Sequence, residues 1–135
     1  ATPFPVNVGG QWRTRWMDGG LLGQWAVWTQ RAVDLLQRVK GARSSGIADV
    51  ELLREGAALT EANAAIFDAA HGFAGCIPGI HEVLRRQGLM AGTWCLDPRE
   101  TLSPGQAREI DRVYRSYPFL SDDDFVAERL DGWLA

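Results

Sequence analysis

The sequence has little of what several classes of protein require. Lys40 is the only lysine among 135 residues, so a chemistry that needs a buried lysine has one candidate. The two cysteines, Cys76 and Cys95, are too few for a disulfide scaffold, and we expect them to be reduced core thiols. No apolar run approaches the roughly 20 residues of a membrane-spanning helix. No charged-then-apolar leader opens the sequence, so we expect a cytoplasmic chain that does not enter a membrane.

The composition is that of a folded globular protein without a large excess of either charge. Hydrophobic residues make up 46% and charged residues 23%, which separates the chain from disordered tails. The net charge of −3 does not build the positive field that nucleic acid requires, so no nucleic-acid partner is expected. The sequence has no phosphate-binding glycine loop and no G-x-S-x-G nucleophile elbow, and we expect neither a cofactor nor a metal.

The spacing of apolar residues predicts an all-α fold in one domain, residues 1–135. Two prolines deny residues 1–8 a fully paired position in a sheet, so one short extended segment is expected there. Residues 9–41 are expected to form a pair of helices, and residues 49–135 the C-terminal helices. The total is five or six helices.

The predicted helical pair follows two apolar patterns. The first helix covers residues 11–17, where two tryptophans lie four residues apart. The second follows an apolar stripe and closes at Lys40-Gly41, as is typical of a helix C-terminus. The residues of this stripe are Leu21, Trp25, Trp28, Ala32, Leu35 and Val39.

Local signals predict where the later helices begin and end. Asp49 is a suitable N-cap for a helix that we expect to end near His71. Pro78 suits the first turn of the next helix, where its missing N–H has no cost. Ser103 and Gln106 have the spacing of a capping box.

Four of the six tryptophans lie near the N-terminus. Their spacings of four and three residues are typical of a helical face. Large aromatic side chains dominate both cores and subunit interfaces, so these roles are expected before the stacking of a ligand. The predicted interface residues are Trp12, Trp16, Trp25 and Trp28.

Three groups of residues could in principle bind a metal ion or form a Schiff base. In each case a structural role is the simpler interpretation. The gaps of five, five and fourteen residues between the two histidines and two cysteines fit no standard zinc site. Four carboxylates could bind a cation, but they lie at the start of an expected last helix capped by Ser121, where the dipole favours them. A Schiff-base lysine must be desolvated, whereas we expect the only lysine in solvent. The two clusters are His71, Cys76, His81 and Cys95, and Asp122, Asp123, Asp124 and Glu128.

Four motifs follow one another within residues 1–118. They are Val6-Asn7-Val8, then Gly23-Gln24-Trp25, then Ile77-Pro78 with His81-Glu82-Val83-Leu84 and Gly88-Leu89, and then Leu96-Asp97-Pro98 with Leu102-Ser103. In this order they resemble the C-terminal part of the dihydrodipicolinate synthase / N-acetylneuraminate lyase family. There, a late barrel strand ends near an Asn, a Gly-polar turn joins two helices, and two proline-containing segments lead into the last helices.

The resemblance implies an architecture without a catalytic centre. Members of this family are (β/α)₈ barrels that form a Schiff base between a strand lysine and a 2-keto acid such as pyruvate. Their C-terminal helices pack on the barrel and help to build the oligomer. The lysine, the catalytic tyrosine and a Thr-Thr pair lie upstream of the matched part, and Lys40, Tyr114 and Tyr117 match none of them. Phe4 and Asn7 alone would approach a substrate pocket, because barrel sites lie at the C-terminal ends of strands.

Three hypotheses follow. The first is a structural and oligomerisation portion of a dihydrodipicolinate synthase-like lyase, of the aldolase class. It predicts open apolar faces, and therefore self-association or a barrel-forming partner chain. The alternative is a stand-alone helical protein–protein interaction module, which predicts a closed monomer or a symmetric dimer with buried tryptophans. The third is a metal-dependent enzyme that uses the His/Cys or Asp cluster, which metal analysis would test.

Overall fold

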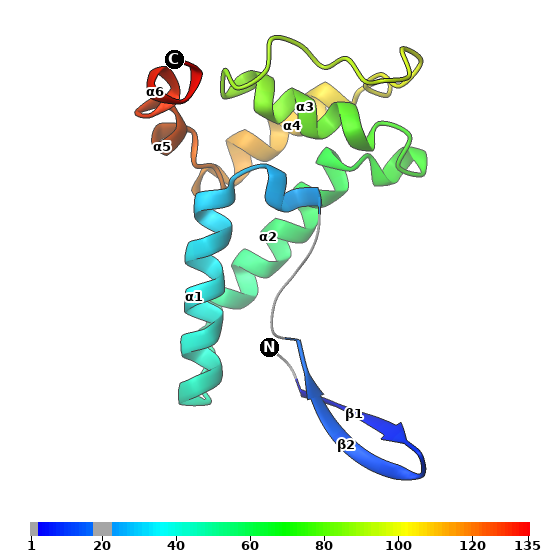
Figure 1. Cartoon of the computed structure of the whole chain (residues 1–135), viewed down its shortest axis with the longest axis vertical. Coiled ribbons are helices and arrows are strands. Elements are labelled where there is room, and N and C mark those ends of the chain that lie inside the picture. Colours follow the sequence, from blue (N-terminus) through cyan, green and yellow to red (C-terminus); the bar gives the residue numbers. More distant parts are fainter. Residues whose placement is uncertain (1–2, 18–22) are drawn as a thin grey trace.

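The computed structural model describes residues 3–17 and 23–135 and consists of an N-terminal β-hairpin and a helical body (Figure 1). The mostly helical class is confirmed. No helix in these two ranges is long and apolar enough to span a membrane. The elements are β1 (Pro3–Val8), β2 (Gln11–Trp16), α1 (Thr29–Ser45), α2 (Val50–Ile66), α3 (Cys76–Arg86), α4 (Gln106–Ser116), α5 (Asp123–Ala127) and α6 (Leu130–Leu134), with short 3-10 helices η1 (Gly23–Ala26), η2 (Ala69–His71) and η3 (Pro118–Leu120).

The N-terminal strands form an antiparallel hairpin, so the helix predicted over residues 11–17 is wrong. Gly9 and Gly10 make the turn with φ values of 59° and 82°, which glycine adopts without strain. The Asn7 side-chain oxygen accepts a hydrogen bond from the Gly10 N–H at 2.9 Å. The Gly-Gly pair favours a hairpin, and residues four apart share a face on a strand as well as on a helix.

The two strands pair with each other, from Val8 opposite Gln11 to Pro3 opposite Trp16. In the described part of the chain they form a sheet of two strands. The strands of a (β/α)₈ barrel run parallel to one another. The hairpin therefore gives no sign of a barrel, and the likeness of residues 1–8 to a barrel strand stays a prediction.

α1 begins and ends later than the apolar stripe predicts. Trp25 lies in η1, and Trp28 takes a left-handed conformation with a φ of 52° just before α1, so both precede the helix. Leu21 lies outside the described residues. The helix passes through Gly41, where an end was predicted, and stops at Gly46, whose φ of 72° is typical of a helix C-cap.

The predicted starts of α2 and α3 are confirmed, whereas the predicted end of α2 is wrong. The Asp49 carboxylate accepts a hydrogen bond of 3.0 Å from a first-turn N–H of α2, as predicted for an N-cap. Pro78 lies in the first turn of α3, also as predicted. α2 ends before the predicted His71 because Asp68 has a left-handed φ of 58°, which a right-handed helix cannot include.

The single last helix predicted from Asp122 is divided into α5 and α6. The Ser121 hydroxyl oxygen accepts the Asp123 N–H at 3.1 Å, but the N-cap residue of α5 is Asp122, so the N-cap predicted at Ser121 is off by one residue. Arg129, between the two helices, has a φ of −117°, which departs from the roughly −63° of a regular α-helix. Gly132 lies inside the short α6, where it weakens helix formation.

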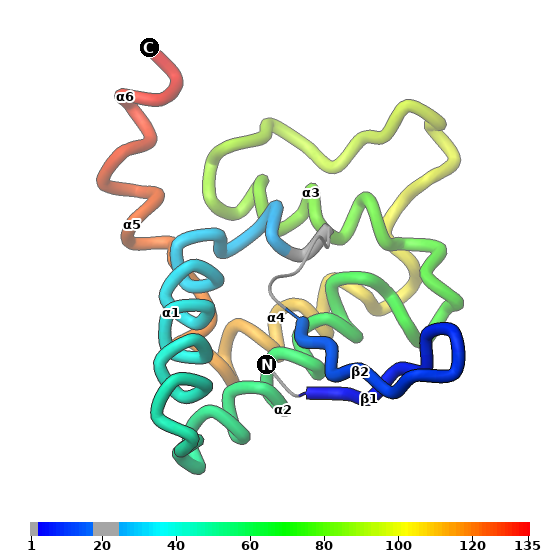
Figure 2. Tube along the Cα trace, turned by 60° about the horizontal axis from the view of Figure 1, so that its bottom comes forward, coloured from blue at the N-terminus to red at the C-terminus, as the bar shows by residue number. Residues whose placement is uncertain are grey.

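The hydrophobic core lies between α2, α3 and α4, at the centre of the trace in Figure 2. Gly79 lets α3 approach α2 closely, because a Cβ at this position would lie 1.9 Å from the Ile66 carbonyl oxygen. The segment before α1 closes the core from the outside. Among the described residues, the largest fully buried side chains are Ile66, Ile110, Val27, Val83, Val113 and Pro78.

Candidate interaction surface

α1 presents an apolar face that the described part of the chain leaves open. None of its 17 residues is buried, and Val33 and Leu36 are 48% and 37% exposed. A helix normally buries its apolar stripe, so this face is the strongest candidate for contact with another protein surface. A groove of about 390 Å³ runs along it, lined by Trp25, Thr29, Ala32, Val33, Leu35, Leu36 and Val39.

The hairpin is exposed on both of its faces. Trp12 and Trp16 lie on one face and are 71% and 41% exposed. The Arg43 guanidinium lies 4.3 Å from the centre of the Trp16 ring, a contact that joins the hairpin to α1. A two-stranded hairpin is at best marginally stable alone in water, so cover from another surface would stabilise this one.

The four predicted interface tryptophans have three different environments. Trp12 and Trp16 are exposed on β2, and Trp25 is half-buried beside the groove of α1. Trp28 is 3% exposed and packs edge-on against Tyr114, with 5.4 Å between the ring centres. Trp28 therefore belongs to the chain's own core and is not accessible to a partner.

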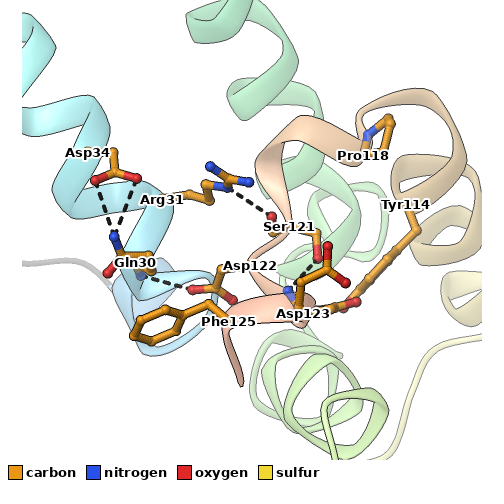
Figure 3. A pocket seen from close by; sticks show the side chains of 10 residues that line it. Gln30, Arg31, Asp34, Tyr114, Pro118, Ser121, Asp122, Asp123 and Phe125 are labelled. Carbon is orange, nitrogen blue, oxygen red and sulfur yellow. Dashed lines mark hydrogen bonds between the residues drawn. The ribbon is translucent and has the colours of Figure 1, made fainter. Parts of the chain in front are cut away.

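The N-terminus of α1 is held by residues that lie about ninety positions later (Figure 3). The Asp122 carboxylate accepts the Gln30 N–H at 2.9 Å. It also accepts the Gln87 side-chain N–H at 2.8 Å. The Arg31 Nε donates to the Ser121 carbonyl at 3.1 Å. Asp122 thus provides the N-terminal cap that Trp28 cannot.

A pocket of about 450 Å³ lies beside this anchor, between α1 and α5 (Figure 3). Asp34, Asp123 and Asp124 line it together with Asp122, and Asp123 accepts the same Gln87 amide at 2.9 Å. Burial, with the nearby Asp123 carboxylate, raises the pKa of Tyr114 to about 12, so this phenol is neutral at pH 7. The carboxylate cluster predicted from the sequence is therefore in part a helix anchor.

Asp68 is a buried carboxylate that binds three different residues. It is 3% exposed and binds His71 Nδ1 at 2.6 Å, Ser103 Oγ at 2.5 Å and the Gly75 N–H at 2.9 Å. Burial acts to raise the pKa of Asp68, but the hydrogen bonds outweigh it, and the pKa lies below its usual value. In a Ser-His-Asp triad the serine hydroxyl donates to the histidine, whereas here both bind to the carboxylate, so the group lacks the geometry of that triad.

Gln106 completes this network. Its amide nitrogen donates to the carbonyls of Gly75 and Ile66 at 2.9 and 3.2 Å, and its amide oxygen accepts the Ser103 N–H at 3.0 Å. The last bond is one half of the predicted capping box. The Ser103 hydroxyl, the other half, donates to Asp68 instead. The sequence pattern predicted the pairing of Ser103 with Gln106 but not the bond from Ser103 to Asp68.

The histidines and cysteines do not gather at one point. His71 binds Asp68, whereas His81 Nδ1 lies 3.8 Å from Cys95 Sγ. Burial, and then the Glu100 carboxylate, raise the pKa of Cys95, so its thiol is protonated at neutral pH. Burial likewise raises the pKa of Cys76. Among the described residues, no group of three or more His, Cys, Asp and Glu side chains could hold a metal ion.

The residues tied to Schiff-base chemistry lie apart from one another. Phe4 and Asn7 are an odd number of positions apart on β1, so they lie on opposite faces of the hairpin. Asn7 is engaged in the turn. Lys40 is exposed on α1, without the burial that a Schiff-base lysine needs.

Comparison with known proteins adds no relative to this picture. No family model, no curated protein and no solved structure matches the chain. The open face of α1 and the exposed hairpin are therefore the features on which a function has to be argued.

Proposed function

We propose that this chain is a non-catalytic, assembly-forming portion of a Schiff-base lyase of the dihydrodipicolinate synthase type. The open face of α1 packs on the barrel portion that carries the catalytic lysine. The observation that supports the proposal best is a 17-residue helix without a buried residue, beside a groove lined almost entirely by apolar side chains. Burying such a face contributes about 25 cal/mol for each Å² of apolar surface removed from water.

The absence of catalysis is tested by trapping a Schiff base. The purified chain is incubated with pyruvate and borohydride, and its intact mass is measured. The expected result is the unmodified mass, because Lys40 is exposed and no described cluster would activate an amine. A reduced-pyruvate adduct on the chain would contradict the proposal.

The open face of α1 is tested with two neighbouring substitutions to the same residue. Leu36→Glu places a charge on the apolar face, whereas Gln37→Glu places it on the polar side of the helix. We expect Leu36→Glu to reduce binding of a hydrophobic dye while changing the free energy of unfolding by less than about 0.5 kcal/mol. Gln37→Glu should change neither. A loss of several kcal/mol from Leu36→Glu would mean that the face is packed within the chain.

A second candidate is a stand-alone helical interaction module, and one observation favours it. The core between α2, α3 and α4 is closed within the chain, with Ile66, Val83 and Ile110 fully buried. This module would use the same face of α1 without a barrel. Addition of a separate barrel chain distinguishes the two, because only the first proposal predicts that the barrel protects Leu36 from dye and from hydrogen exchange.

A further inference from the structure

We propose that the Arg-bearing face of the hairpin docks on the α5–α6 segment of a second copy of this chain, and that the pair closes by a two-fold axis. This inference rests on the assembly-forming role proposed above and names the partner of a different surface. The contact occurs twice in the dimer, because each copy contributes one hairpin and one α5–α6 segment. The face of α1 remains available for the barrel.

The charges of the chain are divided between its two parts. Residues 1–48 carry six Lys or Arg and two Asp or Glu, a formal charge of +4. Residues 49–135 carry eight and fifteen, a formal charge of −7. Such a division disfavours contact between like parts of two copies and favours contact between unlike parts.

On the hairpin, the positive charge is combined with apolar surface. Arg13 lies opposite Val6 and Arg15 opposite Phe4, so both arginines share a face with these apolar side chains. Both arginines are exposed, and neither has an ion pair with an acidic side chain of the described residues. Phe4 and Val8, on the same face, are 38% and 52% exposed. The face is therefore suited to an acidic surface that also offers apolar contact.

The α5–α6 segment has this complementary character. Asp124 and Asp131 are exposed, and Glu128 is paired only with its neighbour Arg129 among the described residues. Trp133 and Leu134 are 52% and 62% exposed. An acidic segment with an exposed indole matches a basic hairpin with exposed aliphatic and aromatic side chains.

The two surfaces cannot meet within one copy. Figures 1 and 2 place the hairpin and α6 at opposite ends of the molecule. A two-fold axis that sets two copies antiparallel brings each hairpin to the partner's α5–α6 segment and leaves neither surface unused.

The exposed area is large enough for this dimer. The chain has 8935 Å² of accessible surface, whereas a compact monomer of 14.9 kDa has about 7,000 Å². The difference is more than twice the roughly 800 Å² that each partner buries in a standard interface. The chain therefore has surface for this contact and for the packing of α1.

The test is a charge exchange between two variants, followed by sedimentation equilibrium at low salt. Arg13→Glu with Arg15→Glu reverses the hairpin, and Asp124→Arg with Asp131→Arg reverses the α5–α6 segment. Each should raise the dissociation constant of the dimer by about 100-fold or more, because like charges then face each other. An equimolar mixture should restore a heterodimer. Arg99→Glu with Arg108→Glu, on exposed arginines of the helical body, changes the net charge by the same amount and should leave the dimer intact.

Each outcome decides the matter. Dimers that are lost in both variants and restored in the mixture support the contact. A wild-type chain that stays monomeric, a dimer that survives both reversals, or open-ended oligomers in place of dimers would overturn it. A wild-type monomer whose α1 binds the dye, with binding abolished by Leu36→Glu, would contradict only the dimer contact. A pyruvate adduct would contradict the proposed function.

Discussion

Two regions of the chain differ in how far they bury their apolar side chains. One is the body formed by α2, α3 and α4, and the other is the N-terminal third formed by the hairpin and α1. The body buries its apolar side chains and holds its turns with saturated networks such as that of Asp68. α1 is longer than α3 or α4, yet it buries no residue. The difference is that the body encloses its apolar side chains, whereas the N-terminal third leaves apolar side chains exposed.

Several specific contacts join the two parts. Val27 and Trp28 insert into the core, and Asp122 caps α1 from the far end of the sequence. Arg38 of α1 forms an ion pair with Glu55 of α2. Such a joint fixes the position of α1 without covering its outer face.

The largest expected effect contrasts two aliphatic side chains, one from each part. Ile110→Ala removes a fully buried side chain and should lower the free energy of unfolding by about 2–5 kcal/mol. Val33→Ala on the open face of α1 should change it by less than about 0.5 kcal/mol. Urea denaturation of both variants measures the contrast, and equal losses would contradict the division into closed and open parts.

Replacing two helical glycines by alanine should change the free energy of unfolding in opposite directions. Gly79→Ala drives a methyl group into the Ile66 carbonyl and should destabilise the chain by about 2–3 kcal/mol. Gly41→Ala in α1 meets open space and should stabilise it by about 0.5–1 kcal/mol, because alanine favours a helix. Thermal denaturation of the pair would sharpen the comparison, and a stabilised Gly79→Ala variant would refute the close packing of α3 on α2.

The Asp68 network predicts a dependence on pH that belongs to the body. Folding lowers the pKa of the Asp68 carboxyl group. The contribution of this group to the free energy of unfolding is therefore present above the unfolded pKa of about 3.9 and is lost as the pH falls through the folded pKa. Asp68→Asn should cost about 1–3 kcal/mol at pH 7 and flatten the loss of stability in acid. Asp97→Asn on an exposed loop serves as the control for a carboxylate whose pKa is also lowered, by hydrogen bonds from Arg99. Parallel acid profiles of wild type and Asp68→Asn would argue against the network.

A modest effect is expected at the joint between the two parts. Asp122→Ala removes the cap of α1 and should cost about 1 kcal/mol, with faster hydrogen exchange confined to the first turn of α1. Asp122→Asn keeps an oxygen acceptor and should lose less. Asp124→Ala, which leaves this cap in place, is the matched control. Unchanged exchange in Asp122→Ala would show that α1 is capped in another way.

The sequence predicts what depends on near neighbours. Asp49 as a cap, Pro78 in a first turn and the helical class all follow from spacing and local chemistry, and the structure confirms them. The hairpin was missed because Trp12 and Trp16 fit a helix and a strand equally well, although the Gly-Gly turn was a signal for a hairpin.

Other features have no local signal. The cap from Asp122 to α1 joins residues 92 positions apart, and the Ser103 hydroxyl that donates to the Asp68 carboxylate lies 35 positions further along the chain. The open face of α1 was only partly predictable. The predicted apolar stripe included neither Val33 nor Leu36, and the exposure of these two side chains depends on how α1 lies against the body.

Hydrogen exchange of the isolated chain, at a concentration where it is monomeric, tests the central claim most directly. If the body is closed and the N-terminal third is open, amides in the middle of α2 and α4 should exchange only through global unfolding. Amides of the hairpin and of α1 should exchange at least about tenfold faster, through local opening. Equal protection across α1, α2 and α4 would contradict the account, because it would show that α1 is an integral part of the core.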